Sequence, residues 1–413
     1  MSVISKDSWV RVAFGEVVRL TRERSADPEA DGLYRYVGLE HIESGDLKIR
    51  RWGETANGTT FTNVFRAGQV LFGKRRAYQR KVAVADFDGV CSGDIYVLEP
   101  KSAQLAPELL PFICQTDGFF EHAVGTSAGS LSPRTNWDSL ASYEFALPPL
   151  DEQRLIADVL EAARGVVDHY RSVTTSSRVL RQSVERRTLI GGVPEAIGNN
   201  TSIEDIRLPP RWQLVAASKL CSVPITSGST PRKGEVRSQM RYPFIKVGNL
   251  TFDGQLDFGA EASHVNRAAF DETSSLHVFP GDVLTNIVGP PLGKVSVVPS
   301  GFPEALINQA IVRYRATSPE IGIWLRAYLM SSWAKRWLFL RSKKTSGQRN
   351  INATTCADLP VPVPPEAQLL ALVARLEEAR TTSIAMSDRA TGARELLTLL
   401  VHEAMPLNDI QRS

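Results

Sequence analysis

The sequence predicts an α+β fold in which two pseudo-symmetric domains are separated by two long antiparallel helices that form a coiled coil. Two observations carry this prediction: a set of landmarks occurs twice along the chain, and each copy ends in a long run of heptad-spaced apolar residues. Before each run, short apolar stretches alternate with Gly, Pro, Asn and Asp, which is typical of strands and turns. Each half therefore combines a sheet-containing domain with one helix.

The composition describes an ordinary globular protein. The chain has 413 residues, of which 43 % are hydrophobic and 23 % charged, enough for two or three domains with their own cores. No eighteen apolar residues stand together and the N-terminus has no charged leader, so we expect a cytosolic protein without a membrane span. The four cysteines lie far apart and outside any metal-ligand spacing, which predicts buried thiols and no metal.

The landmarks establish a tandem duplication. The second member of each pair follows the first by 203 to 216 residues. The pairs are Trp9 and Trp212, Gly68 and Gly281 (each opening a Gly-x-Val-Leu strand), Lys81 and Lys294, and Leu147 and Val363 before their Pro-Pro pairs. A constant order at a nearly constant offset predicts two copies of one domain.

Heptad spacing defines the helices and the domain bounds. In the first helix it runs through Ile156, Val159, Ala163, Val166, Tyr170, Val173, Ser177, Leu180 and Val184. In the second it runs through Leu369, Val373, Leu376, Ala379, Ser383, Met386, Ala390, Ala393, Leu397 and Leu400. We therefore predict domains at residues 1–148 and 193–363 and helices at 149–192 and 364–413. Antiparallel pairing gives an approximate two-fold axis, the symmetry of B-DNA; separate packing of each helix on its own domain is the alternative.

One short stretch looks like a phosphate-binding loop. Residues 68–76 read GQVLFGKRR, but Arg75 stands where a P-loop has Ser or Thr after its lysine. The second copy reads GDVLTNIVGPPLGK and loses the spacing. The two copies share a hairpin that ends in a lysine, so we do not predict a nucleotide site.

Basic residues are concentrated in two tracts. Residues 62–85 contain six Lys or Arg and no acid, and residues 321–357 contain seven and no acid. Such tracts favour contacts with phosphate. His41 is a candidate base, but its counterpart in the second copy is Asn249, which favours a structural hydrogen bond.

The junction before the first helix carries a resemblance to a known family. Residues 147–156, LPPLDEQRLI, resemble the segment that opens the conserved helix in specificity (S) subunits of type I restriction-modification systems. The second junction, VPPEAQLL at 363–370, departs from it, being one residue shorter with Ala367 at a usual Glu. Residues 36–42, 226–232 and 345–351 are also similar to the family.

This resemblance implies two target-recognition domains, each binding one part of a split double-stranded DNA sequence. It also implies that the helices space the domains and dock two methyltransferase (M) subunits, with motor-nuclease (R) subunits joining for cleavage. No cofactor is expected in this chain, because S-adenosylmethionine, ATP and Mg would belong to the partner subunits.

Polar and basic loops supply the candidate DNA contacts, since Arg reads guanine, Asn or Gln reads adenine, and Lys meets phosphate. In the first domain the candidates are Lys74, Arg75, Arg76, Tyr78, Arg80, Ser130, Arg134 and Asn136. In the second they are Ser229, Thr230, Arg232, Lys233, Lys343, Lys344, Gln348, Arg349 and Asn350. Glu152, Gln153 and Gln368 are candidates for partner binding; for Glu152 and Gln153, local capping of the helix is the alternative.

Catalytic motifs are missing from the sequence. There is no Asn/Asp-Pro-Pro-aromatic motif, no glycine-rich cofactor loop, and no HxH or HExxH group among the six histidines. We therefore expect a non-catalytic subunit without a metal. Two other interpretations stay open: a coiled-coil scaffold without sequence-specific DNA binding, and a specificity subunit that serves methylation alone.

Overall fold

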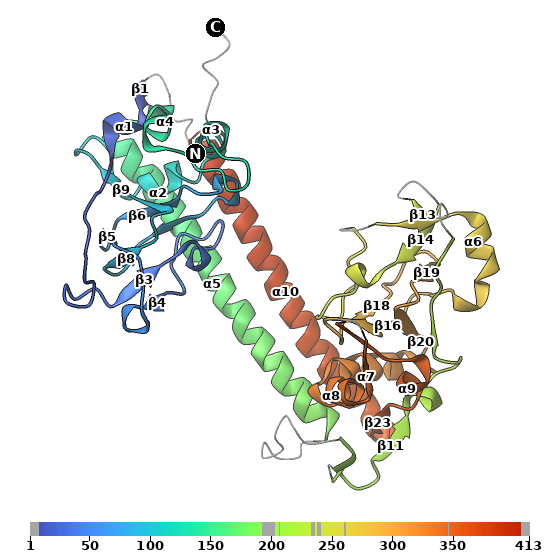
Figure 1. Ribbon diagram of the computed structural model, residues 1–413. Coiled ribbons are helices and arrows are strands. Elements are labelled where there is room, and N and C mark those ends of the chain that lie inside the picture. Colours follow the sequence, from blue (N-terminus) through green and yellow to red (C-terminus); the bar gives the residue numbers. More distant parts are fainter. Residues whose placement is uncertain are drawn as a thin grey trace. The chain divides into compact units, whose positions relative to one another are not determined.

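The computed structural model describes residues 8–191, 203–205, 207–232, 236–237, 241–259, 262–345 and 347–405. The chain divides into two compact units: unit 1 comprises Met1–Ser172 and Ser387–Ser413, and unit 2 comprises Val173–Met386. The long helices α5 (Leu150–Leu189) and α10 (Glu366–Ala404) each contribute to both units (Figure 1). Each unit is therefore built from a sheet-containing segment and part of each helix.

Unit 1 has three small sheets. In the first, β1 (Val10–Ala13) pairs antiparallel with β10 (Glu144–Leu147), the strand that leads into α5. The second has the order β2 (Val18–Leu20), β9 (Ile95–Pro100), β6 (Val70–Gly73), β7 (Val82–Val84). The third has the order β4 (Gly53–Glu54), β3 (Arg35–Val37), β8 (Gly89–Cys91), β5 (Asn63–Phe65), with β3 and β8 parallel. The helical segments are α1 (Phe14–Val17), η2 (Leu39–His41), η3 (Thr55–Asn57), η4 (Ala77–Gln79), α2 (Leu110–Ile113), α3 (Asp117–Gly125) and α4 (Trp137–Ala141).

Unit 2 repeats this plan. β11 (Gln213–Ala216) pairs antiparallel with β23 (Pro360–Val363) before α10. One sheet has the order β12 (Thr226–Ser227), β20 (Ile311–Tyr314), β16 (Val283–Asn286), β18 (Val295–Val297). Another has the order β13 (Val236–Arg237), β15 (His264–Val265), β14 (Tyr242–Ile245), β19 (Leu306–Ile307), with β14 and β19 parallel. A further sheet has the order β17 (Val288–Gly289), β22 (Gln348–Asn350), β21 (Lys343–Thr345). The helical segments are η5 (Ile203–Asp205), η6 (Ala217–Leu220), η7 (Val247–Asn249), α6 (Arg267–Glu272), η8 (Ser274–Leu276), α7 (Pro319–Met330), α8 (Ser332–Arg341) and α9 (Ala353–Ala357).

The lysine shared by the two copies has the same role in both units. Lys81 Nζ donates to the carbonyl of Leu39, the first residue of η2. Lys294 Nζ donates to the carbonyl of Val247, the first residue of η7, at 3.1 Å. The duplicated hairpin therefore ends in a cation that ties it to a 3₁₀ turn.

His41 makes a structural hydrogen bond, as predicted. The backbone N–H of Gly38 donates to His41 Nδ1 at 2.9 Å, and in unit 2 the N–H of Lys246 donates to Asn249 Oδ1 at 2.8 Å. Burial holds the pKa of His41 below its ordinary value; Glu40 opposes this effect and Arg51 reinforces it. Both side chains thus present a neutral acceptor that closes the same turn.

The long helices pack antiparallel. In unit 1, Ile156 and Leu160 near the start of α5 share a core with Leu397 and Val401 near the end of α10. In unit 2, the end of α5 contributes Leu189 to a core shared with the start of α10. The start of α5 packs against the end of α10, and the end of α5 packs against the start of α10. The two helices therefore run in opposite directions, and the predicted antiparallel coiled coil is confirmed.

The predicted apolar seam is right for α10 and partly wrong for α5. All ten predicted positions on α10 are buried or half-buried. On α5, Val159, Val166 and Leu180 are exposed, with exposed fractions of 40 %, 48 % and 63 %. Leu160 and Arg181, each one residue further along, are buried instead. Apolar residues on two adjacent faces made the choice ambiguous, and the buried Arg181 shows that an arginine stem fills part of the seam.

No helix in the described part of the chain is long and apolar enough to cross a bilayer.

Candidate nucleic-acid interface

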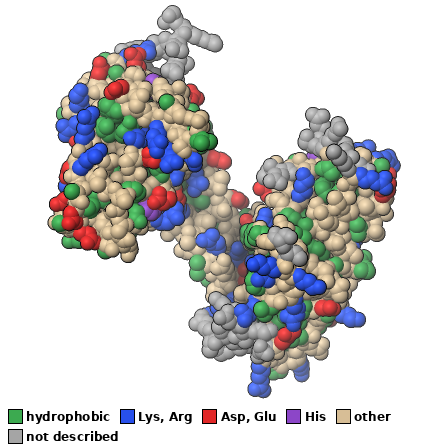
Figure 2. Space-filling view, viewed as in Figure 1, with side chains coloured by type: hydrophobic (Ala, Val, Ile, Leu, Met, Phe, Trp, Pro, Cys, Tyr) green, Lys and Arg blue, Asp and Glu red, His purple; other side chains and the backbone are tan. Residues whose placement is uncertain are grey.

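The two basic tracts are partly neutralised by acids from elsewhere in the same unit. Arg66 pairs with Glu23 and with Asp88, and Arg80 lies 2.7 Å from Asp117. In unit 2 the buried Arg326 pairs with Glu377. The tracts contain no acid in sequence, but folding brings carboxylates from distant positions beside some of their arginines. Figure 2 shows both signs of charge on the visible face of unit 1.

In unit 1 two predicted loops form one structure. Residues 74–80 follow β6, and residues 127–136 lead into α4. The N–H of Arg76 donates to the carbonyl of Pro133 at 2.7 Å, and the N–H of Thr135 donates to the carbonyl of Lys74 at 3.1 Å. Backbone bonds thus hold together two loops whose bonded residues lie 57 and 61 positions apart in the sequence.

Asp94 lies at the base of this structure. Its carboxylate accepts from Arg134 Nε at 2.8 Å and from Arg75 Nη1 at 3.2 Å. Burial of Asp94 favours its neutral form, but the bonds from Arg134 and Arg75 outweigh burial and hold its pKa below the ordinary value. Burial lowers the pKa of Lys74, whose Nζ lies 4.6 Å from the Tyr96 ring centroid. One carboxylate therefore orients two arginines beside a lysine.

The backbone of the first loop is strained at two arginines. Arg76 and Arg80 flank η4 in the left-handed region, with φ of 54° and 52°. Residues other than glycine rarely adopt this conformation, at a cost of about 1 kcal/mol or more each, and such strain is concentrated at functional sites. The strain turns the chain sharply between Arg75 and Lys81.

The remaining unit 1 candidates differ in availability. Tyr78 and Ser130 are exposed. Arg80 donates to the carbonyl of Gln115 at 2.9 Å and lies over the Phe120 ring, so it holds the loop to α3. Asn136 accepts from the N–H of Ser139 at 2.8 Å as the N-cap of α4. Arg80 and Asn136 thus have structural roles that the sequence did not reveal.

In unit 2 the β21–β22 hairpin borders a basic groove. The groove has a volume of about 630 Å³ and runs between the hairpin, residues 289–293 and α8. Lys335, Arg336, Lys344 and Arg349 line it, and the described lining residues include no acid. Burial lowers the pKa of Lys335, and Glu185 opposes the effect. This groove is the strongest candidate anion site in unit 2.

Asn286 shapes one wall of this groove. Its Oδ1 accepts from the N–H groups of Gly293 and Lys294, at 3.1 and 2.9 Å. Its Nδ2 donates to the carbonyls of Val288 and Pro291, at 3.0 and 2.9 Å. Because all four bonds are made by one buried amide, the loop after β16 has a defined course.

Two of the predicted hairpin residues, Lys344 and Arg349, line the groove. The Arg349 guanidinium stacks 3.8 Å from the Phe339 ring centroid and donates to Ser342 Oγ at 3.0 Å. Lys343, Lys344 and Gln348 are exposed. Asn350 pairs in β22 with Val288 and Lys343. The hairpin therefore places the exposed Lys344 and an oriented Arg349 at the groove.

The other unit 2 candidates lie beside β19 instead of the hairpin sheet. The N–H of Ser229 donates to the carbonyl of Ile307 at 3.1 Å, and Thr230 is exposed. Arg232 is exposed, 3.9 Å from Glu272. Lys233 lies outside the described residues.

The partner-binding candidates have distinct environments. Glu152 accepts from the Trp9 indole N–H at 2.9 Å, and Gln368 accepts from that of Trp212 at 3.2 Å. Gln153 is 1 % exposed; it accepts from the N–H of Ala106 and donates to the carbonyls of Gln104 and Pro148. Partner contact by Gln153 is therefore wrong, and its role is local.

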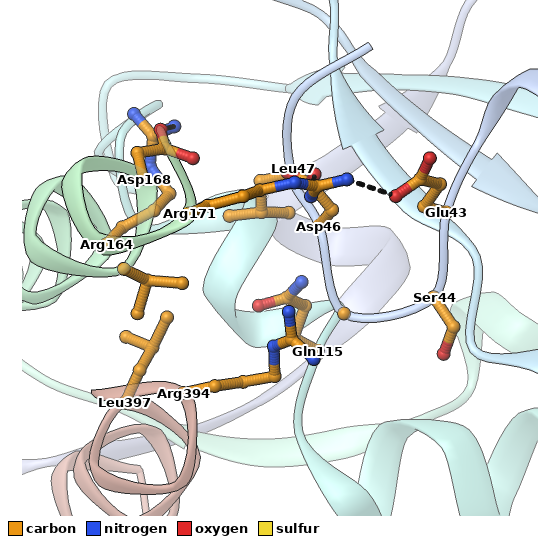
Figure 3. A pocket seen from close by; sticks show the side chains of 12 residues that line it. Glu43, Ser44, Asp46, Leu47, Gln115, Arg164, Asp168, Arg171, Arg394 and Leu397 are labelled. Atoms are coloured by element: carbon orange, nitrogen blue, oxygen red, sulfur yellow. Dashed lines mark hydrogen bonds and ion pairs between the residues drawn. The ribbon is translucent and has the colours of Figure 1, made fainter. Parts of the chain in front are cut away.

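A cluster of ion pairs joins the 43–50 segment of unit 1 to α5. Lys48 lies 2.6 Å from Asp168. Arg171 lies 2.7 Å from Glu43 (Figure 3). Hydrogen bonds from Lys48 and Arg50 outweigh the burial of Asp168 and hold its pKa below the ordinary value. Arg394 of α10 lines the same small cavity of about 130 Å³. These contacts fix the sheet-containing part of unit 1 on its helix.

Sequence reasoning missed Asp94, Ser132, Lys335 and Arg336. Asp94 lies outside both basic tracts, and no local pattern pairs it with Arg134. Lys335 and Arg336 belong to the second tract, but only the α8 backbone shows that they face the hairpin. Among the described residues, no group of three or more His, Cys, Asp or Glu is arranged to hold a metal ion.

Comparisons with known proteins point to one family. Residues 6–165 match the model of the type I restriction modification DNA specificity domain. The chain is 31 % identical over 162 residues to the type I restriction enzyme EcoDI specificity subunit of Escherichia coli, covering 39 % of this chain and 35 % of that protein. It is 22 % identical to the EcoBI specificity subunit of the same species, covering 90 % and 79 %.

The fold is shared with a solved structure. The S subunit of a type I restriction-modification system from M. genitalium superposes with a TM-score of 0.60, at 13 % identity, covering 99 % of both chains. At this identity the likeness concerns the fold alone. The likeness extends over nearly the whole length of both chains.

Proposed function

We propose that this chain is a specificity subunit of a type I restriction-modification system, and that each of its two units binds one part of a divided double-stranded DNA target. The first curated relative is matched over about one third of its length, so substrate and partners are inferred from this chain's own residues. One observation carries the proposal: both copies of the fold present a cationic loop structure held by internal bonds.

In unit 1 the proposed contacts are Lys74, Arg75, Arg76, Tyr78, Ser130 and Arg134. Bonds to Asp94 and Ser132 limit the motion of Arg75, and Asp94 also limits that of Arg134, so less side-chain entropy is lost on binding. Lys74 suits a phosphate, whereas the planar arginines suit a phosphate or the edge of guanine.

In unit 2 the proposed contacts are Lys335, Arg336, Lys343, Lys344, Gln348, Arg349 and Asn350, with Ser229, Thr230, Arg232 and Lys233 as a second group. The groove beside the hairpin combines four cations with an aromatic platform under Arg349. Phosphate contacts would fix the register, and Gln348 and Asn350 would read bases.

The partners proposed for the helices are two methyltransferase subunits, with motor-nuclease subunits joining the assembly. Within unit 1, α5 exposes Leu155, Val159 and Val166, and α10 exposes Leu396 and Leu399. Exposed apolar residues on helices that already have a packed seam favour a protein partner. Glu152 and Gln368 stand at the starts of the two helices as polar contacts. S-adenosylmethionine, ATP and Mg belong to the partners in this proposal.

The test is single-molecule sequencing of methylated adenine in cells that express this chain with its neighbouring methyltransferase, compared with cells that lack this chain. One new motif of two short parts around a fixed gap, modified on both strands, is expected. A folded complex without any motif would instead support a protein scaffold. Methylation without restriction of unmodified DNA would indicate a subunit that serves methylation alone.

A further inference from the structure

Leu131 has an unusual position for a large apolar side chain. Its exposed fraction of 90 % is the highest among the exposed large hydrophobic residues of the described chain. It lies in the 127–136 loop of unit 1, between the exposed Ser130 and the half-buried Ser132. A leucine side chain that stays in water contributes no hydrophobic stabilisation. It contributes only when another molecule covers it.

The loop holds Leu131 outward. Ala128 and Arg134 exchange two backbone hydrogen bonds, of 3.0 and 2.9 Å, which close the loop like a short hairpin. Gly129 adopts a φ of +112°, which an L side chain rarely does, so the chain turns sharply before the tip. Ser132 Oγ accepts from Arg75 at 3.0 Å and from Arg76 at 3.4 Å. Both sides of the tip are therefore fixed.

The surroundings of Leu131 are cationic. Lys74, Arg75, Arg76 and Arg134 lie in the two joined loops, and Asp94 is the carboxylate that pairs with two of them. Four cations and one carboxylate give this cluster a net charge of +3 (4 − 1). A cationic base below a fixed apolar tip suits a polyanion with an apolar interior, which describes stacked base pairs better than a protein surface.

We propose that Leu131 is a wedge that inserts between neighbouring base pairs of the DNA bound by unit 1 and partly unstacks that step. The inference rests on the proposed function and adds the way in which unit 1 holds its half-site. Pyrimidine–purine steps unstack most easily, so such a step is expected at the contact. The hairpin segment 343–350 of unit 2, KKTSGQRN, has no large apolar residue, so the wedge is specific to unit 1.

The experiment uses the full chain in complex with its methyltransferase and a DNA duplex. The duplex contains the target sequence that methylation sequencing has identified. 2-Aminopurine replaces adenine at successive positions of the half-site, because its fluorescence rises when it unstacks. Apart from the adenine that the methyltransferase flips out, the wild type is expected to raise the signal at one step. Leu131→Ala should return that signal to the level of free DNA and weaken binding roughly tenfold, and Leu131→Met should restore both.

Two references separate the wedge from other effects. 2-Aminopurine placed at the adenine that the methyltransferase flips out also fluoresces more strongly, and this second signal should persist in Leu131→Ala. Val10→Ala removes an exposed apolar side chain on β1, outside the loops, and should leave affinity and both signals unchanged.

The outcomes are distinguishable. Sequence-selective binding with the same signal and affinity in Leu131→Ala, or with no wedge signal in the wild type, overturns the wedge while the proposed function stands. Failure of the wild-type complex to select any sequence overturns the proposed function itself. Since Leu131 is almost fully exposed, its replacement leaves the core intact, and an unchanged melting temperature verifies this.

Discussion

The indole Nε1 of Trp9 lies 2.9 Å from a carboxylate oxygen of Glu152, and this contact joins the residue before β1 to the first turn of α5. In unit 2 the same contact joins Trp212 to Gln368 at 3.2 Å. The acceptor is a carboxylate in unit 1 and a side-chain amide in unit 2, and the donor is a tryptophan indole in both. The junction between sheet and helix is therefore duplicated in its side chains as well as its strands.

Removing the hydrogen-bond acceptor should lower the free energy of unfolding more in unit 1 than in unit 2. We expect Glu152→Ala to lower the free energy of unfolding by about 1.5–3 kcal/mol and Gln368→Ala by about 0.5–1.5 kcal/mol, because a hydrogen bond to a charged group is the stronger. Urea denaturation of the full chain measures both. Glu152→Gln, which keeps an acceptor, should fall between wild type and Glu152→Ala; equal losses in both alanine variants would contradict the charge argument.

His41→Asn should remove a pH dependence from unit 1. The pKa of His41 lies below its ordinary 6.5, so its stabilising contribution is full above that value and is lost as the pH falls through the lower folded pKa. Asparagine, the residue at the equivalent position 249, accepts the same hydrogen bond without titrating. Between pH 7.5 and pH 5.5, urea unfolding should show a smaller loss in the free energy of unfolding for the variant than for the wild type. His402→Asn, at an exposed histidine, is the control. If His41→Asn lost as much stability between the two pH values as the wild type, His41 would not be the source of the pH dependence.

Neutralising the arginines of unit 1 should weaken DNA binding and its salt dependence. For Arg75→Ala/Arg76→Ala we expect an affinity loss of roughly tenfold or more, and a slope of log K against log salt that is shallower by about 1–2, since each lost phosphate contact releases about one counterion fewer. Fluorescence anisotropy at several salt concentrations measures this. Assembly with the methyltransferase should be unchanged, and wild-type affinity would disprove the contact.

Asp94→Asn should strengthen nonspecific DNA binding, because it removes a negative charge where the arginine variants remove positive ones. The change leaves Arg75 and Arg134 without their carboxylate, so we expect tighter binding to unrelated DNA, a salt slope steeper by about 1, and poorer discrimination of the target. Competition between target and random duplexes measures the ratio of affinities. A ratio equal to that of the wild type would mean that Asp94 does not orient the arginines for recognition.

The repeat made much of the fold predictable, because paired landmarks report contacts that local propensity does not. Lys81 with Lys294, and His41 with Asn249, were matched by offset alone and make the same bonds in the structure. The seam of α5 was less predictable, since Val159 and Leu160 are both apolar and only packing decides which is buried.

The candidate site was harder to predict because its loops depend on distant partners. The sequence around Gln153 gives no sign that its amide bonds to residues 104, 106 and 148. Nor does a run of arginines show that Asp94 and Asp117 will pair with some of them. Type and spacing located the loops, whereas the use of each side chain depended on tertiary structure.

The core of unit 1 contains residues from both ends of the described chain. Leu397, Val401 and Met405 complete a core whose other buried residues come from positions 12–160. During synthesis the ribosome makes those earlier residues long before α10, so unit 1 has an open apolar face until the last turns of α10 emerge. A premature stop near residue 390 would thus damage the part of the protein that was translated first.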